Sequence, residues 1–285
     1  MNEKGFIASS LLYGLLVIFL VVMLSTIAVL ANKKLSSDKL KETAIDDVSA
    51  DYSSANLIHV WYDSYYVPYL NNNQIVWKDV VSGHTAALSG FTSNVEYSKG
   101  ITFDQNKNII ASSVALKDIV SKDTDFSFSA YIRIDNPPCE TDACPLFRLG
   151  DITSNFVRVD ASSNDYNLEL CYPKIINSGV NSNEPSVSCI EVSSNDFYNN
   201  ENTPVTLTVI FQSGAIRAFI DNKQVNNPDD INVSGGTLDT SSNYPLTIGG
   251  GFMGTIYNFI IYKGILSDAG VEKNTIQNKT RYKVE

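Results

Sequence analysis

The chain has 285 residues, with 21 Lys and Arg against 31 Asp and Glu, so its formal net charge is −10. This acidic balance argues against a nucleic-acid partner, because that kind of binding depends on neutralising phosphates with basic side chains. The length suffices for one large domain with a sizeable core behind an N-terminal segment.

The N-terminal segment is the most apolar part of the chain, because no charged side chain stands between Lys4 and Lys33. A helix needs about 20 apolar residues to cross a bilayer. We therefore expect a leader over residues 1–5 and a single transmembrane helix over residues 6–31. A cleaved signal peptide, a plain anchor and a processed assembly helix stay open, although the apolar stretch is long for a signal peptide.

Residues 32–54 are expected to continue as a helical stalk, since residues 32–52 contain neither Gly nor Pro. The lysines at this end of the span favour a cytoplasmic C-terminus by the positive-inside rule. The four cysteines further along the chain, which are typical of exported domains, outweigh that rule. We therefore expect a protein of the cell membrane with its C-terminal domain outside the cytoplasm.

From residue 55 onward the pattern is that of β-strands. Apolar and polar residues alternate over 126–134 and 205–211, and 216–220 follows the second run after a short Gly-containing turn. Another strand is expected over 255–262. Many short strands separated by Asn-, Ser- and Gly-rich clusters predict a mainly β chain, with residues 55–285 forming one antiparallel sandwich or jelly roll.

Four cysteines, Cys139, Cys144, Cys171 and Cys189, all fall in the expected sandwich. Pairing each with its near neighbour would close two surface loops, which is the usual role of cysteines in an exported domain. Zinc is the alternative, but neither histidine stands near the cysteines in the sequence.

Lys4-Gly5-Phe6 and the apolar run behind it resemble the processing site of type IV prepilins. The resemblance implies cleavage after Gly5, methylation of Phe6 and association with other pilin-like subunits. The fifth residue from Phe6 is Ser10, where pilins usually carry Glu, and this favours a minor subunit.

The downstream motifs resemble the concanavalin A-like, laminin-G-like jelly rolls. They run in order as 74–83, 101–104, 125–131, 218–223 and 246–267, the last including Leu246-Thr247-Ile248-Gly249-Gly250. The resemblance implies a structural calcium site. Its candidate ligands here are Asp79, Asp104 and Asn258, which could equally be turn and strand-end residues.

No catalytic motif stands out. The Glu-x-Asp-x-Glu string that would place a carboxylate pair on one strand face is absent, and Glu169 and Glu191 stand alone on separate expected strands. We therefore expect no enzymatic activity, with glycan hydrolysis as a remote alternative.

Ligand binding is better supported than catalysis, because residues 60–73 are rich in aromatic and amide side chains. Aromatic faces pack on sugar rings, while amides bind hydroxyl groups. Its candidate ligand-binding residues are Trp61, Tyr65, Tyr66, Tyr69 and Asn72. The sequence thus predicts a minor pilin-like surface protein for adhesion to a glycan or a surface protein. The alternative is a structural subunit of a pilus or secretion filament that binds no external ligand.

Overall fold

The computed structural model describes Phe19, Met23 and the residues 52–66, 69–71, 74–81, 84–89, 100–104, 109–115, 125–135, 143–150, 156–162, 168–174, 186–192, 203–212, 215–226 and 245–283. Contacts between Cα atoms divide the chain into a unit over Met1–Ala50 and a unit over Asp51–Glu285. In the first unit only Phe19 and Met23 are described, and both are helical and exposed.

The expected leader with Gly5 and Phe6, and nearly all of the expected transmembrane helix and stalk, lie outside the described residues. Within the described part of the chain, no helix is long and apolar enough to cross a membrane. Tyr52, Ser53 and Ser54, which close the expected stalk, belong to the second unit.

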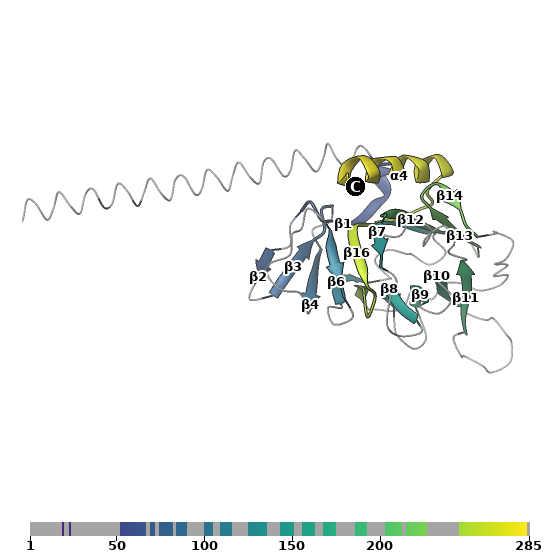
Figure 1. Cartoon of the computed structure of the whole chain (residues 1–285), viewed down its shortest axis with the longest axis horizontal. Helices are drawn as coiled ribbons and strands as arrows, with labels where there is room; N and C mark the ends of the chain where they lie inside the picture. Colours follow the sequence, from purple (N-terminus) through teal and green to yellow (C-terminus); the bar gives the residue numbers. More distant parts are fainter. Residues whose placement is uncertain are drawn as a thin grey trace, which may run out of the picture. The chain divides into compact units, whose positions relative to one another are not determined.

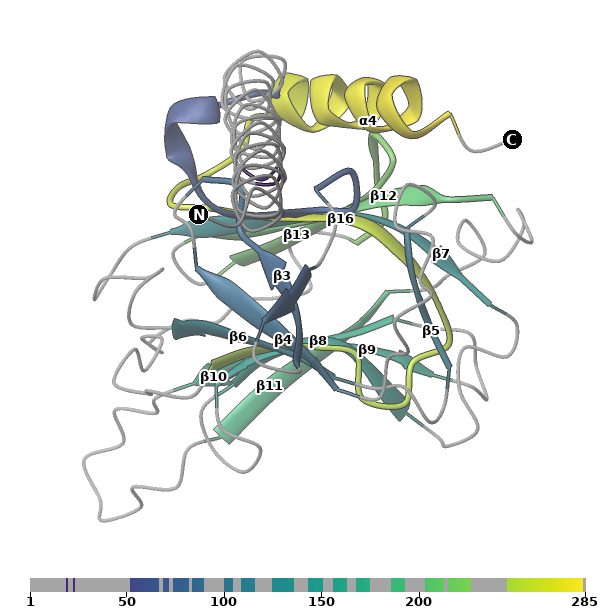
Figure 2. The ribbon, with the colours of Figure 1, turned by 90° about the vertical axis from the view of Figure 1, so that its left-hand side faces the viewer.

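The second unit is mainly β, as predicted, and is built from two antiparallel sheets (Figures 1 and 2). The seven-stranded sheet has the order β1-β16-β7-β12-β13-β14, and β5 also pairs with β16. Its strands are β1 (Ile58–Asp63), β5 (Ile101–Phe103), β7 (Phe126–Ile134), β12 (Val205–Gln212), β13 (Ala215–Ile220), β14 (Lys223–Gln224) and β16 (Gly254–Tyr262).

The nine-stranded sheet has the order β11-β10-β9-β8-β15-β6-β4-β3-β2. Its strands are β2 (Tyr69–Asn71), β3 (Gln74–Lys78), β4 (Thr85–Ser89), β6 (Ile109–Ala115), β8 (Ala143–Gly150), β9 (Phe156–Ser162), β10 (Leu168–Lys174), β11 (Ser186–Val192) and β15 (Pro245–Ile248). A 3₁₀ turn over Ala55–Leu57 precedes β1, and helix α4 (Asp268–Tyr282) follows β16.

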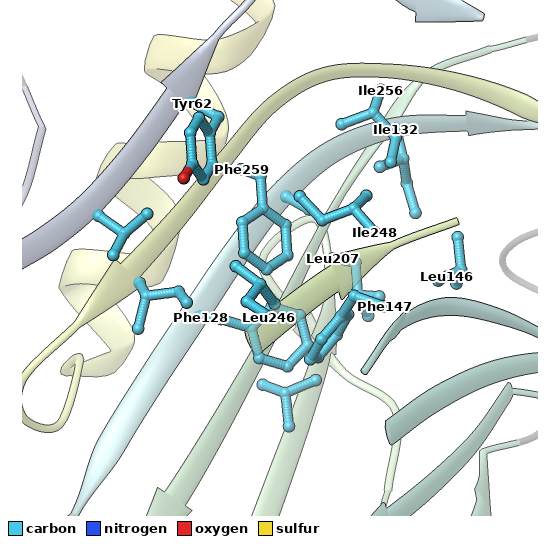
Figure 3. Packing of buried hydrophobic residues seen from close by; sticks show 14 of the residues in the cluster. Tyr62, Phe128, Ile132, Leu146, Phe147, Leu207, Leu246, Ile248, Ile256 and Phe259 are labelled. Atoms are coloured by element: carbon cyan, nitrogen blue, oxygen red, sulfur yellow. The ribbon is translucent and has the colours of Figure 1, made fainter. Parts of the chain in front are cut away.

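The core lies between the two sheets, where their inward-facing apolar side chains interdigitate (Figure 3). Phe128 of β7 and Phe259 of β16 meet Phe147 of β8, with ring centroids 4.2 Å and 5.4 Å from that ring. Burial of such aromatic side chains, each worth about 1.5–3 kcal/mol, holds the two layers together.

Helix α4 covers the outer face of the seven-stranded sheet (Figure 2), so β7, β12 and β16 are buried on both faces. Ser267 caps its first turn by accepting a hydrogen bond from the Gly270 amide. The face that α4 buries is largely polar, and it matches the polar outward side chains that the alternating pattern gives these strands.

Asn278 joins α4 to the sheet at the centre of this polar layer. Its Oδ1 accepts hydrogen bonds from the Tyr52 hydroxyl and from Asn258 Nδ2, both at 2.8 Å. Its Nδ2 donates to Thr206 Oγ1 at 3.0 Å. Buried polar groups are stable only when they are paired, so these bonds fix the position of α4 on the sheet.

Candidate functional site

The last turn of α4 meets the end of β1 at a surface formed by Tyr65, Tyr66 and Arg281, which we call the tyrosine–arginine surface. The Arg281 guanidinium carbon lies 4.5 Å from the Tyr65 ring centroid and 5.9 Å from that of Tyr66. Tyr65 is 45% exposed, and its hydroxyl donates to the Arg281 carbonyl oxygen at 2.9 Å. The surface therefore presents an aromatic ring to solvent in a fixed orientation.

Asp63, the last residue of β1, lies beneath this surface and is fully buried. One carboxylate oxygen accepts from the Tyr65 amide at 2.9 Å and from the Tyr282 hydroxyl at 2.8 Å. The other accepts from Arg281 Nη2 at 2.6 Å. The single carboxylate thus holds the strand end, the exposed tyrosine and the end of α4 in one arrangement.

Burial shifts the pKa values of the side chains that meet at the tyrosine–arginine surface. Burial raises the pKa of Asp63, because desolvation of the carboxylate outweighs the stabilisation that Arg281 and the hydrogen bonds give to its charged form. Burial also raises the pKa of Tyr66 and of Tyr282, so both hydroxyls stay protonated at neutral pH. The pKa of Arg281 is raised by the Asp63 charge despite its own burial, so this side chain remains a cation and a hydrogen-bond donor.

The structure divides the aromatic residues that the sequence singled out. Tyr65 and Tyr66 come together with Arg281, whereas Trp61 is fully buried and cannot contact a ligand, so that prediction is wrong. The Trp61 ring packs against Tyr52 at a centroid distance of 5.2 Å. Tyr69 lies in β2 but its side chain is outside the described residues, as is Asn72.

The three candidate calcium ligands do not come together. Asp79 lies along the open edge of β1, where its Oδ1 accepts from the amides of Trp61 and Val81. Asn258 is buried under α4, and β-pairing places Asp104 next to the opposite end of β16, about 16 Å from Asn258 at 3.3 Å per residue. Among the described residues, no group of three or more His, Cys, Asp or Glu could hold a metal ion, and calcium binding elsewhere stays a prediction.

The cysteines whose side chains the structure describes are engaged in disulfide bonds. Cys144 and Cys189 are disulfide-bonded, and no free cysteine occurs in the described part of the chain. The backbone of Cys171 stands directly opposite that of Cys189 in the β10–β11 ladder, and the pairing of each cysteine with its near neighbour stays a prediction. Cys139 lies outside the described residues.

Sequence reasoning missed one carboxylate pair. Glu169 of β10 and Glu191 of β11 stand directly opposite each other in the antiparallel ladder. The neighbouring residue Leu170 faces the core and is fully buried, so both glutamates lie on the outer face of the nine-stranded sheet. Side chains opposed in this way have Cβ atoms about 4.5–5.5 Å apart. Only the pairing register, which a single strand cannot show, reveals the pair.

No family model matches the chain, and no curated protein matches it in sequence. Solved structures do share its fold. A mutant of Trypanosoma rangeli sialidase with trans-sialidase activity matches 88% of this chain over 39% of its own length, with 13% identity and a TM-score of 0.55. The chain thus spans about two-fifths of that sialidase.

Two further structures extend this likeness. Domain 4 of AbnA, a GH43 extracellular arabinanase of Geobacillus stearothermophilus solved with arabinotriose, matches 76% of this chain over 98% of its length, with 13% identity and a TM-score of 0.51. A structure of botulinum neurotoxin type C, whose cell entry depends on interaction with two ganglioside molecules, matches 80% of this chain over 53% of its own length, with 15% identity and a TM-score of 0.52. At such identities the likeness shows a shared β-sandwich fold.

These matches correct two sequence-based predictions. The assignment as a minor pilin-like adhesin is contradicted, because the structures that share the fold are glycan-active sialidases, an arabinanase domain and a toxin described with gangliosides. The expectation that the protein has no enzymatic activity is contradicted by the same sialidase and arabinanase neighbours.

Proposed function

We propose that the sandwich, which we assign to the concanavalin A-like, laminin-G-like type, binds a carbohydrate. The observation that carries this proposal is the likeness to a complete arabinanase domain that was solved with arabinotriose. The bonded cysteines Cys144 and Cys189 further support a domain that acts outside the reducing cytoplasm.

The tyrosine–arginine surface is the contact site that we propose for the sugar. The exposed ring of Tyr65 offers an apolar face, and its hydrogen bond to the Arg281 carbonyl lowers the entropy lost on binding. Asp63 accepts a hydrogen bond from Arg281 Nη2, and Arg281 Nε is buried. The remaining N–H groups on the two Nη atoms are therefore those that we propose donate to sugar hydroxyl or carboxylate oxygens.

The test is a glycan array probed with the full chain, followed by titration of the best ligand. Tyr65→Ala should weaken binding roughly two- to twelvefold, since one aromatic contact is worth about 0.5–1.5 kcal/mol. Ile276→Ala, which removes a 58% exposed side chain elsewhere on α4, should leave affinity unchanged. Absence of binding to any neutral or acidic glycan on the arrays would refute carbohydrate binding. Unchanged affinity of Tyr65→Ala for the best ligand would refute only the tyrosine–arginine surface as its site.

Glycoside hydrolysis is the second candidate, and the opposed Glu169 and Glu191 favour it. Retaining glycosidases hold two carboxyl groups about 5–5.5 Å apart, a spacing within reach of two side chains directly opposite in a ladder. Sialosides and arabinan oligosaccharides are the substrates to test, with product release measured by chromatography. Glu169→Gln and Glu191→Gln should each abolish turnover, while Glu272→Gln on the exposed side of α4 should not; activity that survives both substitutions would rule out this pair.

A further inference from the structure

Tyr52, near the start of the second unit, contacts two strands of the seven-stranded sheet and the helix that covers it. Its side chain is 1% exposed. The ring packs edge-on against Trp61 of β1 at a centroid distance of 5.2 Å. The hydroxyl donates to Asn278 Oδ1 of α4 at 2.8 Å and accepts from Asn258 Nδ2 of β16 at 3.1 Å. One side chain therefore joins the point where the chain enters this unit to β1, β16 and α4.

These contacts lead to both halves of the ion pair beneath the tyrosine–arginine surface. Along α4, Asn278 precedes Arg281 by three residues, a spacing that makes them neighbours on one face of a helix. Along β1, Trp61 precedes Asp63 by two residues, so both lie on the same face of the strand. Because Arg281 and Asp63 pair at 2.6 Å, Tyr52 closes a ring of contacts through β1 and α4. A shift of Asn278 would therefore displace the guanidinium of the surface.

The protonation state of Tyr52 keeps its hydroxyl available as a donor. Burial raises the pKa of Tyr52, and the charge of Asp63 raises it further, while Arg281 lowers it. The hydroxyl therefore stays protonated at neutral pH, and its hydrogen bond selects the oxygen of the Asn278 amide as the acceptor. The nitrogen of that amide is then free to donate to Thr206 Oγ1, at 3.0 Å.

The backbone that follows Tyr52 is fixed as well. The Ser53 amide donates to Asn274 Oδ1 of α4 at 2.8 Å. Ser54 has a φ of 53°, a left-handed conformation that is uncommon for serine, and it leads into the 3₁₀ turn over Ala55–Leu57. Such a conformation persists where the surrounding contacts hold the chain. The entry segment is therefore part of the folded unit.

We infer that Tyr52 is a positioning residue for the tyrosine–arginine surface and acts through Asn278. Without the hydroxyl, one N–H of Asn258 Nδ2 loses its acceptor in the interior, so the Asn278 amide and the last turn of α4 can take other positions. The fraction of molecules with Arg281 in place then falls, and the apparent affinity for a sugar falls with it. The effect on affinity rests on the function proposed above, whereas the arrangement of Arg281 can be measured without a ligand.

The first test follows the Arg281 side chain by NMR in the full chain labelled with ¹⁵N at arginine. Its Nε–H signal is assigned by its loss in Arg281→Met, and burial of Nε protects the proton from exchange. Tyr52→Phe keeps the ring on Trp61 and removes only the hydroxyl, and it should shift the Arg281 signal. An unshifted signal would overturn the inference.

Tyr262→Phe is the matched control. The buried Tyr262 hydroxyl accepts from Asn274 Nδ2 at 2.9 Å, so this variant also removes a hydroxyl bonded to α4. Asn274 lies about two helical turns from Arg281, whereas Asn278 lies within one. Tyr262→Phe should therefore leave the Arg281 signal in place. An equal shift in both variants would also overturn the inference, because it would reflect general loosening of α4.

Calorimetry with the best glycan from the array provides the second test. Tyr52→Phe should weaken binding roughly threefold or more, and Tyr262→Phe should not weaken it. In the Asn278→Ala background, Tyr52→Phe should have no further effect, because the two residues act in series. A full effect of Tyr52→Phe in that background would contradict the route through Asn278. Absence of glycan binding together with a shifted Arg281 signal would refute the proposed function but support Tyr52 as a positioning residue.

Discussion

Arg281→Met removes the cation that pairs with buried Asp63 while keeping an unbranched apolar side chain against Tyr65. Asp63 is then left as an uncompensated carboxylate in the interior. Loss of one partner of a buried ion pair costs about 3–5 kcal/mol. We therefore expect the free energy of unfolding at pH 7 to fall by about 3–4 kcal/mol.

The loss of stability has an upper limit that depends on pH, because Asp63 can lose its charge by taking up a proton. With the ordinary carboxyl pKa of 3.8, protonation at pH 7 costs about 1.36 kcal/mol for each of 3.2 pH units, or about 4.4 kcal/mol. At pH 5 the same limit is about 1.6 kcal/mol. Burial already raises the pKa of Asp63, and loss of Arg281 raises it further, so the folded variant holds the proton more tightly than its unfolded chain. The deficit relative to wild type must therefore shrink as the pH falls from 7 to 5.

Urea denaturation of the full chain, followed by tryptophan fluorescence, measures both values, because Trp61 and Trp77 are fully buried. The matched control is Arg217→Met, whose partner Asp268 lies 2.7 Å away but is 74% exposed. An exposed pair of this kind is worth about 0–1 kcal/mol. A deficit that does not change between pH 7 and pH 5, or one no larger than that of Arg217→Met, would refute the reasoning.

Three other predictions concern the layer under α4 and a strand end. Asn278→Ala should cost about 2–4 kcal/mol, because Asn258 Nδ2 loses a buried acceptor; a cost in urea titrations below 1 kcal/mol would count against the polar layer as a fixed network. Gly254→Ala should cost roughly 2–4 kcal/mol by thermal melts, since φ is 153° and a Cβ would collide with the Arg133 carbonyl oxygen; an unchanged melting temperature would contradict it. Burial raises the pKa of Tyr131 to about 12, so the folded state holds this proton more tightly and stability should fall between pH 10 and pH 12. Phenolate absorbance tests this point, and titration of all tyrosines near pH 10 in the folded protein would disprove it.

Much of the fold could be predicted because strand alternation is a local property. The pattern over Phe126–Ile134 gave the bounds of β7, and the hairpin of β12 and β13 followed from its short turn. The pattern did not show that the polar faces of these strands are also covered. Strand alternation would place only one of the neighbours Trp61 and Tyr62 in the core, yet both are buried, because Tyr62 faces the second sheet while Trp61 packs on Tyr52.

The candidate site was predictable only in its first half. An aromatic run at the end of a strand identified Tyr65 and Tyr66. Asp63 and Arg281, which position them, are separated by 218 residues and are joined only by the packing of α4. No spacing rule connects groups so far apart, because their contact depends on the path of the whole chain.

The sequence by itself determined the composition class and the strand pattern of this protein. These properties depend on side chains that act within a few residues of one another. The tertiary structure alone decided which of these residues meet: Glu169 with Glu191, Tyr52 with Asn278, and Asp63 with Arg281. Strand register and helix docking are fixed by the free energy of the whole core, so each of these pairings is a property of the folded chain.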